Sequence, residues 1–252
     1  REARALSLLK SHPNVVQFIG VVLSPCMAIV CRLCEGGSLD ALLYQPDVVL
    51  SVQHKLRFVR HVARGVSHLH SSGVVHRDIA ARNVLLDGAD FVRCTCLLGD
   101  FGLARPDDEL ATGNRTEAAT GPVPWMAPEQ LVELRYSTSS DVWALGVLFY
   151  EIITRTLPWH GCHVPQVVVR VVRGETLDVV DDDTLAPSWL RALMRTCFAY
   201  VPQQRPSAEQ VVHVLDVQYG DVLQPPRSPP LRHSSSPPSP PSSSAQQQQQ
   251  HS

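Results

Sequence analysis

Three oxygen-bearing side chains stand at short, ordered distances in the middle of the chain: Asp78, Asn83 and Asp100. Asp78 closes a His-Arg-Asp tripeptide, Asn83 follows five residues later, and Asp100 opens an Asp-Phe-Gly tripeptide. A carboxylate such as Asp78 can accept the proton of an attacking hydroxyl group, and the oxygens of Asn83 and Asp100 are hard ligands suited to Mg²⁺. Each residue alone would be explained equally well by a turn. The prediction therefore depends on the spacing of the whole set, which we expect the fold to bring to one side of the molecule.

Three further motifs follow in a fixed order. Ala127-Pro128-Glu129 comes first, then an apolar stretch that begins Asp141-Val142-Trp143-Ala144-Leu145-Gly146-Val147, and then Arg205-Pro206-Ser207. Together with the His-Arg-Asp and Asp-Phe-Gly tripeptides, these motifs resemble those of the eukaryotic protein kinase family. The chance of five ordered motifs arising independently is negligible.

The resemblance extends over residues 1–220 and implies an α+β, protein-kinase-like fold. Residues 1–34 are expected to form a partial, β-containing small lobe with the mobile helix, its following strands and the hinge. Residues 35–220 are expected to form a mainly helical large lobe, and residues 221–252 a disordered tail rich in Pro, Ser and Gln.

The resemblance also implies roles for single residues, with ATP and Mg²⁺ as cofactors and proteins as substrates. Asp78 would be the catalytic base, Asn83 and Asp100 would hold Mg²⁺, and Arg82 would neutralise the transferred phosphate. The residues expected at the nucleotide are Glu2, Cys31, Leu33, Cys34, Leu85 and Asp100. Those expected to have structural or regulatory roles are His76, Arg77, Phe101, Gly102, Thr116, Glu129, Asp141 and Arg205.

Two of these roles concern pairs of segments that are distant in the sequence. Asp141 resembles the aspartate whose side chain supports the backbone of the catalytic loop. Arg205 resembles the late arginine that pairs with the glutamate of the Ala-Pro-Glu motif, here Glu129.

The segment from Ile29 to Leu39 resembles the hinge between the two lobes of a kinase. Cys31 stands at the gatekeeper position, and the backbones of Leu33 and Cys34 would face the adenine ring. Arg32 stands where the family often has an acid. Because Cys31 and Cys34 lack a second ligand pair, we expect them to be small buried hydrophobes rather than zinc ligands.

Two alternatives remain for the hydroxyl group that accepts the phosphate, that of tyrosine and that of serine or threonine. Ala80-Ala81-Arg82 resembles tyrosine kinases, because serine/threonine kinases usually place a lysine at the position of Ala80. Residues 121–129 also resemble the tyrosine-kinase platform, although Pro124 replaces a basic residue. Thr156-Leu157-Pro158-Trp159 and Cys197-Phe198 look more like the tyrosine-kinase-like serine/threonine group. We favour a tyrosine kinase.

A kinase also needs a Gly-rich loop and a lysine that pairs with the glutamate of the mobile helix, expected here at Glu2. The only lysines are Lys10 and Lys55, and neither stands at a suitable place. The resemblance thus implies that the first strands of the small lobe are missing from this sequence. The alternative to an enzyme is a pseudokinase-like scaffold, if the N-terminus is genuine.

The segment between Asp100 and Glu129 contains no tyrosine, so activation by phosphotyrosine within it is excluded. Thr112, Thr116 and Thr120 remain as candidate sites, and we name Thr116 as the hypothesis because Arg77 could supply a cationic pocket for its phosphate.

Composition limits the other functions. The 22 Lys and Arg against 24 Asp and Glu give a net charge of −2, so the basic excess typical of nucleic-acid binding is missing. No apolar run reaches the roughly 18 residues of a membrane span. Seven irregularly spaced cysteines and the lack of a secretory signal favour a cytoplasmic protein, or the cytoplasmic part of a longer membrane protein. The Pro/Ser-rich tail offers possible docking sites for partner proteins.

Periodicity predicts the local structure. Strands are expected at 15–23, 27–33, 84–86 and 92–98, the last two forming a hairpin, and helices at 2–10, 38–44, 52–70, 128–134, 139–154, 164–173, 187–197 and 207–217.

Overall fold

The computed structural model of the chain describes residues 9–24, 26, 28–106, 121–177 and 181–223. Its strands are β1 (Phe18–Val22), β2 (Ala28–Cys31), β3 (Val74–Val75), β4 (Val84–Leu86), β5 (Cys96–Leu98) and β6 (Arg105–Pro106). Its helices are α2 (Leu39–Leu43), α3 (Val52–Ser71), α5 (Pro128–Glu133), α6 (Thr138–Thr154), α7 (Val164–Val172), α8 (Ser188–Cys197) and α9 (Ala208–Leu223), with short 3₁₀ turns at Ala81–Asn83, Val123–Trp125 and Pro202–Gln204.

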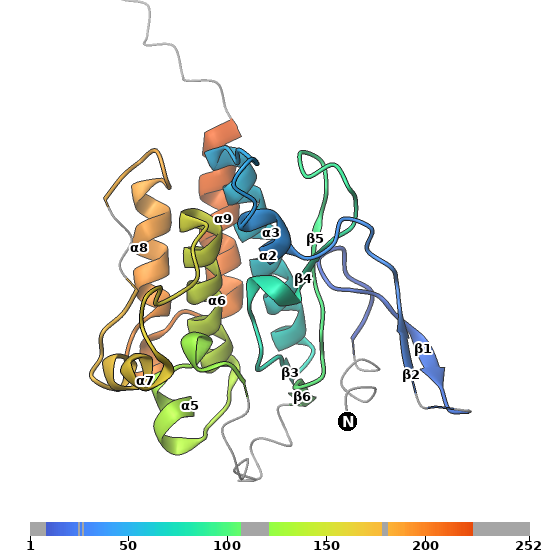
Figure 1. Ribbon diagram of the computed structural model, residues 1–252, viewed down its shortest axis with the longest axis horizontal. Helices are drawn as coiled ribbons and strands as arrows, with labels where there is room; N and C mark the ends of the chain where they lie inside the picture. The colour runs from blue at the N-terminus through green and yellow to red at the C-terminus, as the bar shows by residue number, and fades with distance from the viewer. Residues whose placement is uncertain (1–8, 25, 27, 107–120, 178–180, 224–252) are drawn as a thin grey trace, which may run out of the picture.

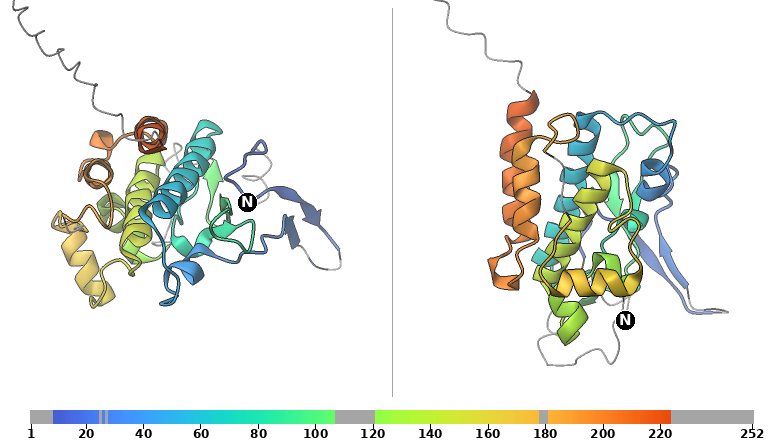
Figure 2. Two further views of the ribbon diagram at one scale, coloured as in Figure 1. Left: turned by 90° about the horizontal axis from the view of Figure 1, so that it is seen from above. Right: turned by 60° about the vertical axis from the view of Figure 1, so that its left-hand side comes forward.

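The strands and the helices occupy different sides of the molecule. Antiparallel β1 and β2 form a hairpin that projects from one side in every view, whereas α3, α6, α8 and α9 pack together on the other side (Figures 1 and 2). Between them, β3 pairs with β6 and β4 pairs with β5, each as a two-stranded antiparallel sheet. The expected division into a small β-containing part and a helical lobe is therefore present.

Helix α3 forms one side of the helical core. Ser51 caps its N-terminus, since the Ser51 hydroxyl accepts the backbone N–H of His54 at 3.2 Å. Apolar residues at helical spacing then give it one buried face, made by Leu56, Phe58, Val59, Val62, Ala63, Val66 and Leu69. This face packs on α6 and α9.

Helix α6 runs through the middle of the helical lobe, and thirteen of its residues, from Ser140 to Ile153, are buried. The Ser137 side chain accepts the backbone N–H of Ser140, which starts the helix, and Arg155 ends it in a left-handed conformation with φ 57°. A helix covered on all sides explains why this stretch is apolar all round rather than amphipathic.

The segment before β1 attaches the hairpin to the helical lobe. Leu98 donates its backbone N–H to Asn14 and accepts that of Val16, both at 2.9 Å. The backbone passes so close to α3 that a Cβ atom at Gly65 would lie 2.6 Å from the Asn14 carbonyl oxygen. Glycine at position 65 is thus required by the contact between the two parts of the molecule.

Several sequence-based boundaries were wrong. β1 starts at Phe18 rather than at Val15, and β5 starts at Cys96 rather than at Val92, because Asp90 closes a turn by accepting the N–H groups of Arg93 and Cys94. The pairing of β3 with β6 was not expected from the sequence.

The last helix also differs from the expectation. α9 continues to Leu223, past the expected end at Val217. The expected helix at 2–10 and the tail from Gln224 onward lie largely outside the described residues. None of the described helices is both long and apolar enough to cross a membrane.

Candidate active site

The catalytic loop expected from His76 to Asn83 joins β3 to β4, and its backbone is fixed by Asp141 of α6. The Asp141 carboxylate, which is 1% exposed, accepts the backbone N–H of His76 at 2.8 Å and that of Arg77 at 2.9 Å. Arg77 adopts a left-handed conformation with φ 73°. The carboxylate satisfies two N–H groups that a buried loop would otherwise leave without acceptors.

Asp78 projects from this loop between two donors. Arg82 forms an ion pair with its Oδ1, and the Asn83 side-chain amide donates to its Oδ2 at 2.8 Å. The same amide nitrogen donates to the Asp78 carbonyl oxygen at 2.7 Å. The Asp78 side chain remains 15% exposed. The expected base is therefore held in one orientation while it stays accessible from the surface.

Asn83 and Asp100 are brought together by the β4–β5 hairpin. Gly99 donates its backbone N–H to the Asn83 carbonyl oxygen at 2.8 Å, which places Asp100 next to the catalytic loop. Asp100 is exposed and takes a left-handed conformation with φ 53°. Its Oδ1 accepts the N–H of Gly102 at 3.2 Å.

His76 links the loop to the Asp-Phe-Gly segment from a fully buried position. Its Nδ1 accepts the Asp78 backbone N–H at 3.2 Å, and its Nε2 lies 3.0 Å from the Gly99 carbonyl oxygen. Burial lowers the pKa of His76, so the ring is neutral. A neutral ring that accepts at Nδ1 must carry its proton on Nε2, which then donates to Gly99. The Phe101 ring packs against it with the centroids 5.3 Å apart.

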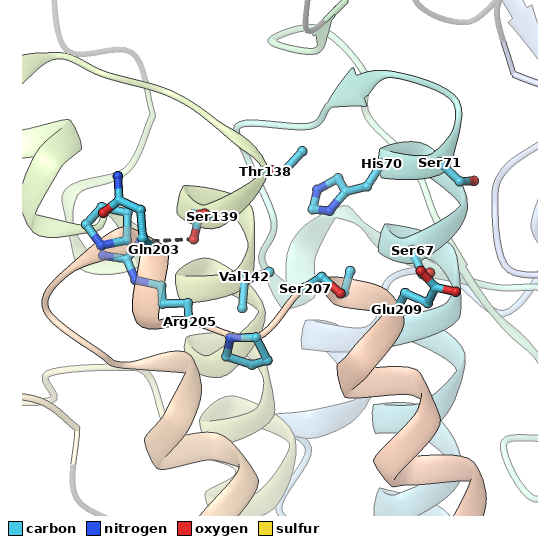
Figure 3. Close-up of a pocket in the computed structure, with 13 residues that line it drawn as sticks. Ser67, His70, Ser71, Thr138, Ser139, Val142, Gln203, Arg205, Ser207 and Glu209 are labelled. Atoms are coloured by element: carbon cyan, nitrogen blue, oxygen red, sulfur yellow. Dashed lines mark hydrogen bonds between the residues drawn. The ribbon is translucent and has the colours of Figure 1, made fainter.

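Arg205 and Glu129 form the ion pair expected from the sequence. Two bonds of 2.6 and 2.8 Å join the guanidinium to the two carboxylate oxygens, in a bidentate arrangement. Arg205 also lines a cavity of about 520 Å³, shown in Figure 3. His70 lines the cavity, and its Nε2 lies 2.9 Å from Asp141 Oδ2.

The expected hinge connects β2 to α2, and backbone hydrogen bonds join it to neighbouring segments. Arg32 donates to Gln17 at 2.9 Å and Gly36 to Leu86 at 3.0 Å. A Cβ atom at Gly36 would lie 2.4 Å from the Gly88 carbonyl oxygen, so only glycine fits there.

Within the described residues, no backbone-to-backbone hydrogen bond involves Leu33 or Cys34. The backbone N–H and C=O groups of these two residues are the polar groups that an adenine ring would need. Leu85 is half-buried, pairs with Leu97 in β4–β5 and forms an antiparallel bridge with Ser38 at the end of the hinge. The prediction that Cys31 is buried was wrong, since its side chain is exposed, and Cys34 is only half-buried. β2 has no further strand beside it among the described residues, which explains this exposure.

Two expected site residues, Glu2 and Thr116, lie outside the described residues. Arg77, expected to face Thr116, has its guanidinium 3.9 Å from the centroid of the Tyr136 ring. The cationic pocket remains a prediction.

Sequence reasoning missed Glu151, Trp125 and Tyr44 as parts of one network. Trp125 donates its indole N–H to Glu151 at 2.7 Å, and Tyr44 donates its hydroxyl to the same carboxylate at 2.8 Å. The available signal was an acid, Glu151, near the C-terminal end of the largely apolar α6.

Comparison with known proteins shows the family of the chain. A family model described as protein tyrosine and serine/threonine kinase matches residues 1–215. Ephrin type-A receptor 8 of Mus musculus is 35% identical over 208 residues, which cover 81% of this chain and 20% of the receptor. Ephrin type-A receptor 7 of Gallus gallus is 34% identical over 209 residues, with 81% and 20% covered. Spermatocyte protein spe-8 of Caenorhabditis briggsae is 30% identical over 223 residues, with 87% and 41% covered.

The chain thus spans between 20% and 41% of the length of these relatives. The family model, in contrast, covers most of the chain, including every motif placed around Asp78. This chain belongs to the protein tyrosine and serine/threonine kinase family.

Proposed function

We propose that the protein containing this chain transfers the γ-phosphoryl group of ATP to a hydroxyl group of a protein substrate, most readily that of a tyrosine. The observation that carries the proposal is the position of Asp78, which is held by Arg82 and Asn83 and stays partly exposed. In this function Asp78 accepts the proton of the attacking hydroxyl, and Arg82 lies ready to neutralise charge on the phosphoryl group.

The residues around Asp78 fit Mg²⁺ and ATP by their donor chemistry. The Asn83 amide nitrogen is used by Asp78, so its side-chain oxygen is the atom left for a cation. Asp100 adds an exposed carboxylate. Mg²⁺ is usually held by one or two carboxylates and completes its shell with phosphate oxygens and water, so this small donor set suits it. When bound, Mg·ATP supplies the phosphoryl group and neutralises its charge.

The preference for tyrosine is supported by the side chains near the phosphoryl position. Ala80 leaves no lysine there, and the only cation that contacts Asp78 among the described residues is Arg82. The Arg82 guanidinium in turn lies 4.9 Å from the centroid of the Trp125 ring. The cation beside the base is therefore an arginine that packs on an aromatic ring, in agreement with the arginine that the resemblance to tyrosine kinases implies here.

The seven cysteines stand at irregular spacings in the sequence, which favours a reducing compartment. We place the domain in the cytoplasm, alone or as the cytoplasmic part of a longer membrane protein, and we assign the Pro/Ser-rich tail a docking role.

The test is phosphate transfer by the full-length protein and by its Asp78→Asn variant, with Mg·ATP and a mixture of Tyr, Ser and Thr peptides. We expect phosphotyrosine that depends on Asp78. Phosphoserine or phosphothreonine would assign the protein to the serine/threonine group. A folded wild type that transfers no phosphate would leave a scaffold as the function.

A further inference from the structure

We propose that Glu151 is a positioning residue for catalysis: its buried carboxylate fixes the Trp125 indole, and the indole fixes Arg82 against Asp78. Glu151 is one of the thirteen buried residues of α6. Its hydrogen bonds go to Tyr44, Ala81 and Trp125 and not to Asp78 or Arg82, although the charge of Arg82 also acts on its carboxyl group. The inference rests on the proposed kinase function, in which Asp78 and Arg82 act on the substrate.

Glu151 is an acidic residue in a buried position, where a charged side chain lowers the stability of the fold. The residue is 1% exposed, and burial raises the pKa of its carboxyl group. Its donors among the described residues are uncharged: Tyr44 at Oε1, and Trp125 and the Ala81 backbone N–H at Oε2, the last at 3.2 Å. An apolar residue would suit the core of α6 better, so the acid is explained by what it holds.

What Glu151 holds are two segments of the proposed active site. Ala81 belongs to the catalytic loop, between Asp78 and Asn83. Trp125 ends the 3₁₀ turn that precedes the Ala-Pro-Glu motif and α5. One carboxylate oxygen therefore joins the catalytic loop to the segment that faces it.

Trp125 passes this constraint on to Arg82. The Arg82 guanidinium lies over the indole at 4.9 Å from its centroid, within the range of a cation–π contact, and ion-pairs with Asp78. The Arg82 side chain is 36% exposed, so packing alone does not restrict it. A rotated indole would offer its edge rather than its face, and Arg82 would leave Asp78. Asn83 would still hold the other oxygen of Asp78, so a partial loss of activity is expected.

The first experiment compares variants at positions 151 and 125 in the full-length protein. Glu151→Leu removes the acceptor, and Trp125→Phe keeps a ring but removes the indole donor. We expect each to lower kcat roughly tenfold with little change in the KM for ATP. Glu151→Gln can accept from Trp125 with its amide oxygen and donate to the Tyr44 hydroxyl with its amide nitrogen. It should therefore retain kcat within about threefold. A Gln variant as impaired as the Leu variant would overturn the hydrogen-bond argument.

The second experiment asks whether the effect passes through Arg82. Arg82→Lys keeps the charge but loses the planar group that stacks on the indole. In that background Trp125→Phe should lower kcat less than about twofold, because the contact it disturbs is already gone. Equal losses in both backgrounds would overturn the inference and leave Trp125 as a purely structural residue.

A third measurement does not need catalysis and remains informative where Glu151→Leu fails to fold. The ¹⁵N–¹H resonance of the Trp125 indole should shift in Glu151→Gln and stay in place in Tyr44→Phe, which removes only the donor at the other oxygen. An unchanged Trp125 resonance in Glu151→Gln would refute the contact. A wild type that transfers no phosphate would overturn the proposed function and this inference together. If the wild type is active but Trp125→Phe lowers kcat equally in the wild-type and Arg82→Lys backgrounds, this inference alone is overturned.

Discussion

The Arg205 guanidinium meets the Glu129 carboxylate through two hydrogen bonds, with the two side chains 0% and 5% exposed. Arg205 also donates to the carbonyl oxygens of Ala199 and Ser139 at 2.8 and 2.9 Å, and its guanidinium lies 5.1 Å from the centroid of the Trp143 ring. One arginine thus ties the start of α5, the start of α6 and the turn before α9 to each other.

Removing this arginine should destabilise the whole helical lobe. Arg205→Leu leaves the Glu129 charge buried without a partner, which costs about 3–5 kcal/mol. For a domain of this size that loss lowers Tm by roughly 10 °C, measured by thermal unfolding. Arg135→Ala is the matched control, because Arg135 pairs with Glu133 on the surface, with side chains 61% and 45% exposed. It should change stability by less than about 1 kcal/mol. Similar losses in both variants would contradict the special weight given to the buried pair.

A second prediction concerns the support of the catalytic loop by Asp141. Asp141→Asn replaces one of the two acceptor oxygens by a donor, so in either orientation of the amide the backbone N–H of His76 or that of Arg77 loses its acceptor in a buried place. We expect kcat to fall by roughly 10- to 100-fold, with a smaller change in the KM for ATP. Steady-state kinetics of the full-length protein measure both.

Asp216→Asn provides the control for this variant. Asp216 pairs with Arg60 and Arg64 between α9 and α3, away from the catalytic loop. It should leave kcat unchanged. A kcat of Asp141→Asn equal to that of the wild type would show that the loop holds its shape without this carboxylate.

Much of the fold could be predicted because its signals are local. Helix α3 has a capping serine and one apolar face, and α6 is apolar all round, so both were located to within one or two residues. The ion pair between Arg205 and Glu129 was expected from motifs in a known order, although 76 residues separate the partners.

The remainder depends on contacts that have no local signature. Glu151 resembles the end of an apolar run until Trp125 and Tyr44 fold against it. The exposure of Cys31 could not be predicted either, because it depends on which strands lie beside β2. Burial is a property of the tertiary structure. The periodicity of apolar residues in the sequence indicates burial only for elements that pack against a partner on one face.

A third prediction tests the hinge by chemical labelling. Cys34 is half-buried at the place expected for the adenine ring, and burial raises the pKa of its thiol. Because the thiolate is the reactive form, iodoacetamide should label Cys34 more slowly than the exposed Cys26 in the β1–β2 turn. Adding Mg·ATP to the full-length protein should slow the labelling of Cys34 severalfold and leave that of Cys26 unchanged, as followed by mass spectrometry. Equal rates at Cys34 with and without nucleotide would contradict the placement of adenine at the hinge.

A fourth prediction follows from His61, which lies on α3 beside β5. Its Nδ1 accepts the backbone N–H of Cys96 at 3.2 Å, which requires the unprotonated ring nitrogen. Burial, followed by the charges of Arg57, Arg60 and Arg64, lowers the pKa of His61 from 6.5 to about 4.

The folded state therefore resists protonation of His61 at a pH where the unfolded chain accepts the proton. The stability that the neutral ring contributes is present above pH 6.5 and is lost as the pH falls toward 4. By about pH 5 the loss is roughly 2 kcal/mol. His61→Gln offers the same kind of acceptor to Cys96 but does not titrate, so its stability should fall less between pH 7 and 5, as measured by urea unfolding at each pH. Parallel curves for the two proteins would show that His61 titrates normally and that the bond to Cys96 does not depend on its neutral form.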